Sequence, residues 1–127
     1  MDTACIKQFA AEFDPQPFHL DENAAQESIF KGLVASGWHT AAVGMRLFVT
    51  GGLPFAEGLI GFGGELSWPR PTRAGDVVQL ESEIIDIKVS RSKPHQGIVT
   101  VRAEMFNQKR ETVYLLTAKL LVSKRTS

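Results

Sequence analysis

The sequence predicts an α+β fold in which a curved antiparallel β-sheet wraps around one long central α-helix. Apolar residues recur at helical spacing up to residue 50, and the apolar period changes to two after residue 55. The longest helical stretch is apolar on nearly every side, which is typical of a buried helix. The strands that follow can pack against this helix, but one small sheet cannot enclose the helix on all sides. We therefore expect a second subunit, related by two-fold symmetry.

The first part of the chain divides into three predicted helices. Residues 3–13 carry apolar side chains at helical spacing, and Pro15 ends this helix. Residues 21–27 start a second helix, which Asp21 can cap and whose first turn carries acidic residues; Ile29 and Phe30 close this helix, and Gly32 ends it. Residues 33–49 contain no proline and form the long buried helix, which residues 50–54 terminate with two glycines and a proline.

The second part of the chain alternates between apolar and polar residues, as strands do. Residues 59–68 predict a bent strand broken by glycines, and residues 77–89 a long strand whose apolar phase switches at Ile84–Ile85. That switch indicates a β-bulge or a strong bend. Residues 99–105 and 113–122 predict the remaining two strands. Polar turns or connections occupy residues 69–76, 90–97 and 107–112, and the chain ends in a polar tail.

Length and composition exclude several classes of protein. A chain of 127 residues fits one domain, residues 1–127, and 43% hydrophobic with 22% charged residues is an ordinary globular composition. The 14 basic residues equal the 14 acidic ones, which argues against capture of nucleic acid by charge. One cysteine, Cys5, allows no intrachain disulfide. With no apolar signal region and no membrane-spanning run, we expect a cytoplasmic protein that binds no membrane.

The candidate site lies where the first helix gives way to the second. Asp14 and His19 are side chains suited to proton transfer near neutral pH, and Pro15 and Pro17 predict a stiff, extended loop between them. A loop of that kind loses little entropy when it holds two side chains together. Spacing alone favours a structural role, because an acid and a histidine five residues apart also commonly order a loop.

Three motifs add a resemblance to a known family. Asp14-Pro-Gln-Pro-Phe-His19, then Val34-Ala-Ser-Gly37, then Leu66-Ser-Trp-Pro-Arg-Pro71 resemble the MaoC-like dehydratases of the hot-dog fold, which include the (R)-specific enoyl-CoA hydratases. The resemblance covers most of the chain. Gln16 stands where this family often has Asn, and Ser36 where it often has His. The strand that usually precedes the family's first helix is missing here or very short.

The resemblance implies that Asp14 and His19 are a catalytic pair holding one water, which adds syn across the C2=C3 bond of a 2-enoyl thioester in fatty acid metabolism. It also implies that Gly37 supplies a backbone N–H to the enolate that forms. Ser36 is expected to be either an ordinary helix cap or a weak contact to the substrate. A helix N-terminus suits this role, because its unpaired N–H groups carry partial positive charge. The reaction needs no cofactor beyond the coenzyme A or acyl carrier of the substrate.

Several other residues have two interpretations. Arg70, Arg91 and Lys93 are possible contacts for coenzyme A phosphates, or charges on a solvated sheet edge. His39 is expected to be a packed, hydrogen-bonded core residue, and we likewise place both tryptophans in the core. The three histidines and the cysteine show no metal-ligand spacing, so no metal site is expected.

Two functions besides the hydratase remain open. A thioesterase on the same fold would use a carboxylate to direct water at the thioester carbonyl. A non-catalytic acyl-binding subunit would need a partner chain to complete its acyl tunnel. In each case the expected ligand is an acyl-CoA or acyl-carrier thioester, and the expected assembly is a homodimer or a higher homo-oligomer.

Overall fold

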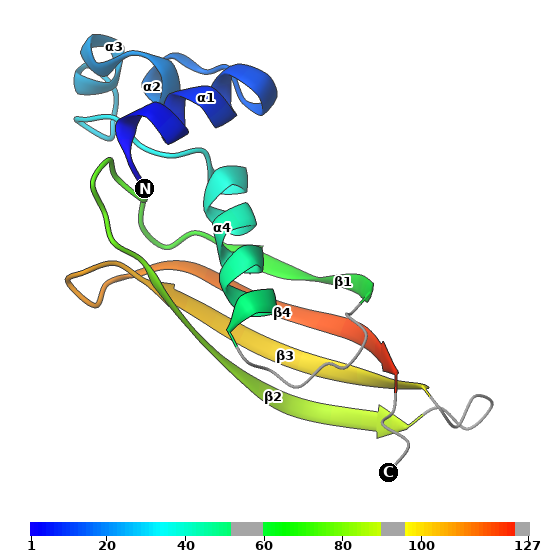
Figure 1. Cartoon of the computed structure of the whole chain (residues 1–127). Coiled ribbons are helices and arrows are strands. Elements are labelled where there is room, and N and C mark those ends of the chain that lie inside the picture. The colour runs from blue at the N-terminus through cyan, green and yellow to red at the C-terminus, as the bar shows by residue number, and fades with distance from the viewer. Residues whose placement is uncertain (52–59, 90–95, 124–127) are drawn as a thin grey trace.

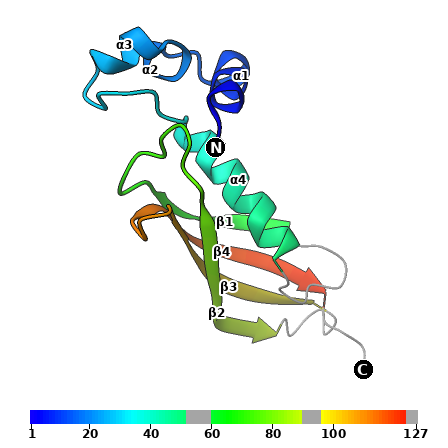
Figure 2. The same cartoon turned by 60° about the vertical axis from the view of Figure 1, so that its left-hand side comes forward.

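The computed structural model describes residues 1–51, 60–89 and 96–123, and its elements confirm the α+β class (Figure 1). The helices are α1 (Thr3–Phe13), α2 (Pro17–Leu20), α3 (Glu22–Gln26) and α4 (Gly37–Thr50). The strands are β1 (Ile60–Ser67), β2 (Gln79–Val89), β3 (Gln96–Phe106) and β4 (Thr112–Ser123). Helix α4 lies over one face of the sheet, and α1, α2 and α3 gather beyond its N-terminal end (Figures 1 and 2). Within these ranges, no helix is both long and apolar enough to cross a bilayer.

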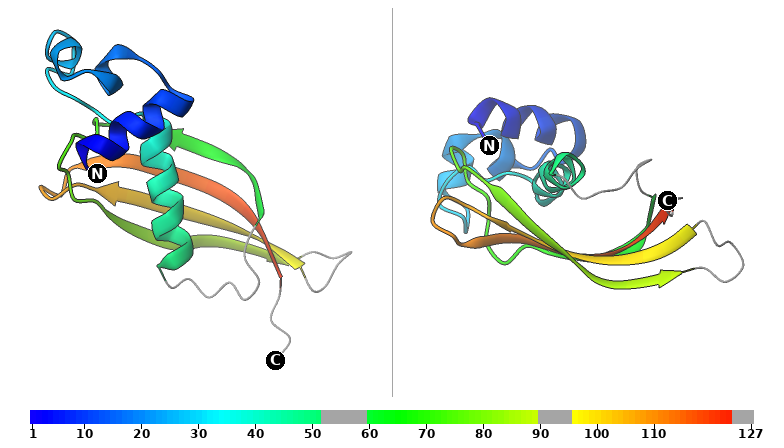
Figure 3. Two further views of the ribbon diagram at one scale, coloured as in Figure 1. Left: turned by 45° about the horizontal axis from the view of Figure 1, so that its top comes forward. Right: turned by 60° about the horizontal axis from the view of Figure 1, so that its bottom comes forward.

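The sheet is antiparallel throughout, and its strand order is β1-β4-β3-β2. The register of β2 against β3 shifts between Ile84 and Asp86, which confirms the predicted bulge. A second shift, between Gly61 and Gly63, bends β1 against β4. The sheet is therefore curved, with all four described helices on one side of it (Figure 3). This is the predicted arrangement of a sheet bent around a central helix.

The core between α4 and the sheet is formed by side chains from both. Phe48 near the end of α4 packs against Val99, Val101 and Leu120 of the central strands, all of them buried. Gly44, nearer the middle of α4, faces Tyr114, and a Cβ atom at Gly44 would lie only 3.0 Å from that ring. This close approach fixes α4 on the sheet and so fixes the position of its N-terminus.

The small helices form a separate apolar cluster. Ile6 of α1 and Ala25 of α3 are fully buried and pack with Leu33. The predicted extended loop is wrong after its second proline, because Pro17 opens the one-turn helix α2, which contains His19. Proline is favourable at a first helical position, where its fixed φ suits the helix and no N–H is needed.

The long helix begins four residues later than the sequence predicts. Residues 33–36 run alongside the 72–74 segment: Val34 forms an isolated bridge with Arg73, and the Ala35 N–H donates to the Thr72 carbonyl at 2.8 Å. Ser36 then caps α4. These apolar residues are buried as expected, but their backbone hydrogen bonds go to another segment rather than to a helix.

One face of α4 is not covered by the described residues of this chain. Trp38, Met45 and Val49 expose 59%, 44% and 57% of their surfaces, so the sheet alone does not enclose the helix, as the sequence predicts. The exposed apolar face fits the expected second subunit, which stays a prediction.

Candidate active site

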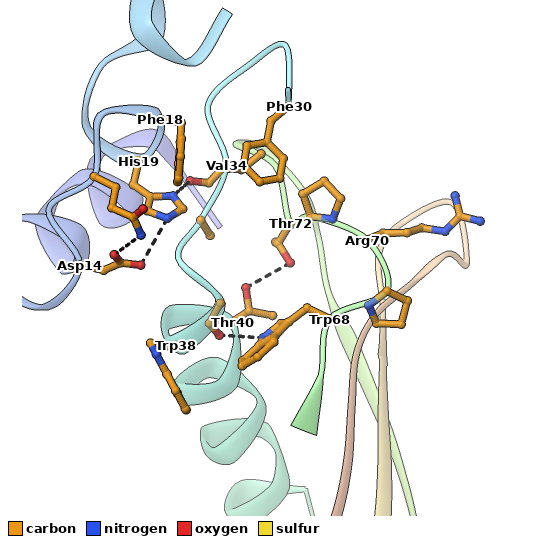
Figure 4. A pocket seen from close by; sticks show the side chains of 15 residues that line it. Asp14, Phe18, His19, Phe30, Val34, Trp38, Thr40, Trp68, Arg70 and Thr72 are labelled. Atoms are coloured by element: carbon orange, nitrogen blue, oxygen red, sulfur yellow. Dashed lines mark hydrogen bonds and ion pairs between the residues drawn. The ribbon is translucent and has the colours of Figure 1, made fainter. Parts of the chain in front are cut away.

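A cavity of about 520 Å³ opens at the N-terminal end of α4, between the small helices and the segment 68–72. Asp14, His19 and Gly37 all line it, so the structure brings together three residues that the sequence singled out. Figure 4 shows Asp14 and His19 side by side, with Trp68 and Thr72 across the cavity. The volume lies within the range of small-molecule sites, about 300–1,000 Å³.

The contacts of His19 determine what Asp14 and His19 can do together. His19 Nε2 lies 3.3 Å from Asp14 Oδ2, and the two side chains are only 6% and 18% exposed. His19 Nδ1 lies 2.7 Å from the carbonyl oxygen of Val34, which can only accept, so this nitrogen carries a hydrogen and donates it. In the neutral ring Nε2 then presents a lone pair to the carboxylate. Two acceptors at this distance need either a shared proton between them or a water that lies to one side, in the cavity, and contacts both.

Two further hydrogen bonds hold the Asp14 carboxylate. Ser36 Oγ donates to Oδ2 at 2.6 Å, and Gln16 Nε2 donates to Oδ1 at 2.5 Å. Partial burial raises the pKa of Asp14, but these two bonds and the interaction with His19 together outweigh it. The pKa of Asp14 therefore lies below its ordinary value, and Asp14 is ionised at neutral pH.

Ser36 supports the site from behind rather than lining it. Its side chain is fully buried and does not line the cavity. Its hydroxyl oxygen donates to Asp14 and accepts from the Trp38 N–H at 3.3 Å, which caps α4. Of the two roles expected for Ser36, the helix cap is the one that this structure shows. The serine links the carboxylate to the helix N-terminus.

Gly37 lies at the first position of α4, where its N–H has no partner within the helix. A Cβ atom there would lie 2.9 Å from the Trp68 ring, whose Nε1 donates to the Gly37 carbonyl at 2.9 Å. The missing side chain thus makes room for Trp68, a close contact that the sequence did not predict. Trp38 and Trp68 both line the cavity, so placing them in the core was wrong.

The candidate phosphate contacts receive less support. Arg70 lies at the edge of the cavity, 58% exposed, and forms an ion pair of 2.8 Å with Glu111. Arg91 and Lys93 lie outside the described residues. Across the described ranges, no cluster of three or more His, Cys, Asp or Glu side chains could hold a metal ion.

Two polar residues of α4 were misjudged or missed. His39 is buried and stacks on Phe9 with ring centroids 4.6 Å apart, but its Nδ1 has no hydrogen-bond partner among the described residues, contrary to expectation. Burial lowers the pKa of His39. Thr40 lines the cavity and donates from Oγ1 to Thr72 Oγ1 at 3.2 Å, tying α4 to the opposite wall. Helical spacing from Gly37 could have indicated this position.

Comparisons with known proteins agree with this arrangement. The sequence profile of the MaoC like domain family matches residues 1–105. The chain is 33% identical over 112 residues to the uncharacterized protein YdeM of Bacillus subtilis (strain 168), covering 86% of this chain and 77% of that protein.

Solved structures give the same result. A MaoC-like dehydratase from Rhodospirillum rubrum is 55% identical, with a TM-score of 0.95 over 100% of this chain and 87% of that one. The (R)-hydratase from A. caviae involved in PHA biosynthesis is 28% identical, with a TM-score of 0.75 over 98% and 89% of the two chains. R-hydratase PhaJ1 from Pseudomonas aeruginosa is 27% identical, with a TM-score of 0.77 over 98% and 76%. The chain therefore belongs to the MaoC-like domain family and has its hot-dog fold.

Proposed function

We propose that this protein adds water to a 2-enoyl thioester, or removes it from the corresponding (R)-3-hydroxyacyl thioester. The observation that carries the proposal is the facing of Asp14 Oδ2 and His19 Nε2 across 3.3 Å, inside a cavity at a helix N-terminus. Similarity to a MaoC-like dehydratase and to two (R)-hydratases supports the same reaction class.

His19 is the proposed general base. Because Nδ1 donates to Val34, the nitrogen free to take a proton is Nε2, which points at Asp14. A water that contacts both side chains loses a proton to Nε2 as its oxygen attacks C3. The Asp14 carboxylate orients that water and stabilises the imidazolium that forms. The imidazolium then returns the proton to C2 on the same face, so the addition is syn and both side chains end as they began.

The charge that develops on the thioester carbonyl needs a donor. In the proposal, the carbonyl oxygen lies at the N-terminus of α4 and accepts from the Gly37 N–H, where the helix dipole favours negative charge. A donor fixed in place before the reaction costs no reorganisation during it. We propose no cofactor, and we assign the carrier of the acyl group to coenzyme A or an acyl-carrier thioester, with Arg70 at the cavity edge as the phosphate contact.

Product analysis tests the proposal against its alternatives. Purified protein is incubated with crotonyl-CoA, and the products are separated by chromatography alongside a free-thiol assay. Formation of 3-hydroxybutyryl-CoA without release of coenzyme A is the expected result. Release of coenzyme A would indicate a thioesterase instead. No product from short or medium enoyl thioesters would rule out the hydratase, and a size-exclusion measurement would then test for a partner chain.

A further inference from the structure

A second cavity lies behind the candidate active site. It has a volume of about 550 Å³ and lies between the exposed face of α4 and strands β1 and β4. Its lining is almost wholly apolar, including Ala41 and Met45 of α4, Phe62 and Leu66 of β1, and Leu116 of β4. A long hydrocarbon chain lying there would bury apolar surface against these side chains.

Two tryptophans stand between this second cavity and the first. Trp38 lines both cavities, and Trp68 lines the first while its ring lies 6.2 Å, centroid to centroid, from Tyr114, which lines the second. The two indole rings meet edge to face, with centroids 5.5 Å apart. Figure 4 shows both on the α4 side of the candidate active site, opposite the small helices.

The position of Trp68 is fixed by more than its ring contacts. Its Nε1 donates to the Gly37 carbonyl at 2.9 Å, and the ring fills the space that a side chain at Gly37 would occupy. A side chain with a hydrogen bond at one end and an aromatic neighbour on each side has little freedom to swing away. Trp68 is therefore held in place between the two cavities, and we call the Trp38–Trp68 pair the partition.

We infer that the Trp38–Trp68 pair sets the substrate's chain length by closing the active site off from the apolar cavity, so that the protein accepts short acyl groups. This inference rests on the proposed function and deepens it. With the thioester carbonyl at Gly37, an acyl tail that continues past C3 meets the indole rings rather than the apolar space behind them. A methylene that cannot enter the apolar cavity is not buried there. One methylene in an apolar pocket changes the ratio of kcat/KM values about tenfold or more.

The test replaces the partition and measures chain-length preference. The wild-type protein is expected to hydrate crotonyl-CoA with a kcat/KM at least about tenfold above that for 2-octenoyl-CoA. Trp38→Ala should raise the octenoyl-to-crotonyl ratio by about tenfold, which corresponds to ~1.4 kcal/mol in the barrier. Because Trp38 is 59% exposed, its truncation leaves no large void in the core. Trp68→Leu, from the other half of the pair, should change the ratio in the same direction.

A binding measurement keeps the inference separate from the proposed function. Isothermal titration calorimetry with saturated butyryl-CoA and octanoyl-CoA, on the same variants, requires no turnover. Ile29→Ala is the control, because Ile29 is 89% exposed and lines neither cavity. Its ratio should stay at the wild-type value.

The outcomes separate the two claims. If no variant hydrates any enoyl thioester but Trp38→Ala improves octanoyl binding relative to butyryl binding, the proposed function is wrong and the partition stands. If crotonyl-CoA is hydrated but the chain-length ratios of turnover and binding stay unchanged in both tryptophan variants, the partition is wrong and the function stands. Equal wild-type use of both chain lengths would also overturn the partition. If neither acyl-CoA is bound or converted, both claims fail.

Discussion

Ser36 donates a 2.6 Å hydrogen bond to Asp14 Oδ2, the same oxygen that lies 3.3 Å from His19 Nε2. Because Ser36 also caps α4, one buried hydroxyl connects the Asp14 carboxylate with the helix N-terminus that faces the cavity. The position of Asp14 thus depends on a residue that is fully buried. Ser36 is a positioning residue in the proposed mechanism.

Removing that hydroxyl should change the pH profile and not only the rate. Ser36→Ala deletes a bond that lowers the pKa of Asp14, so the part of the acid limb of the kcat/KM profile that reports Asp14, distinct from protonation of the base His19, should move to higher pH. A hydrogen bond to a charged group contributes about 1.5–3 kcal/mol, so the rate at neutral pH should fall roughly tenfold or more. Ser36→Thr keeps the hydroxyl and should restore the limb. A uniform loss of rate with no shift would show that Ser36 acts only as a cap.

Asp14 should also contribute to stability in a pH-dependent way. Its pKa is lowered in the folded protein, so it contributes stability above the unfolded-state value of about 3.9, and this is lost as the pH falls through the folded value. Urea unfolding of the wild type and Asp14→Asn from pH 7 to pH 3 measures the difference. The wild-type advantage should be constant near neutrality and shrink below about pH 4. A gap that widens with acid would contradict this.

Stability should also depend on pH through His39, for a different reason. Burial lowers its pKa, the charge of the N-terminus adds to the effect, and Asp2 opposes it. The unfolded chain therefore binds a proton more readily, so this contribution is fully present above about pH 6.5 and is lost as the pH falls. His39→Phe should keep the stacking on Phe9 and remove the loss, which unfolding curves at pH 7.5 and 5.5 would show. Parallel pH dependence in both proteins would disprove this assignment.

Gly37 should tolerate no side chain. A Cβ atom 2.9 Å from the Trp68 ring forces that ring to move, and overpacking of this kind costs about 1–3 kcal/mol. Gly37→Ala should therefore lower the free energy of unfolding by about that amount and reduce hydration. Gly61→Ala is the matched control, because a Cβ at Gly61 meets nothing within 4 Å. Equal effects of the two substitutions would show that the contact with Trp68 is unimportant.

Local patterns were enough to predict most of the elements. Apolar spacing identified α1, the cap at Asp21 identified α3, and the phase switch at Ile84–Ile85 located the bulge in β2. Each of these features depends on residues close together in the sequence, where side-chain period and backbone propensity agree.

What the sequence could not provide depends on contacts between distant segments. The tautomer of His19 follows from the Val34 carbonyl, and the charge state of Asp14 depends on Ser36, 22 residues away. Trp68 contacts Gly37, which is 31 residues away in the sequence, and this contact places on the cavity wall a tryptophan that the sequence assigned to the core. Helix α4 begins later than predicted because backbone groups of residues 33–36 form hydrogen bonds with another segment. Apolar composition alone does not reveal such pairing.

The most direct measurement is the initial rate of crotonyl-CoA hydration by the wild type, Asp14→Asn and His19→Asn. If the two side chains hold and activate one water, each substitution should lower kcat by about a hundredfold or more, while far-ultraviolet circular dichroism stays unchanged. The double variant should be little slower than either single one, because the residues act as a unit. Folded variants that keep wild-type rates within a few fold would contradict the proposed mechanism.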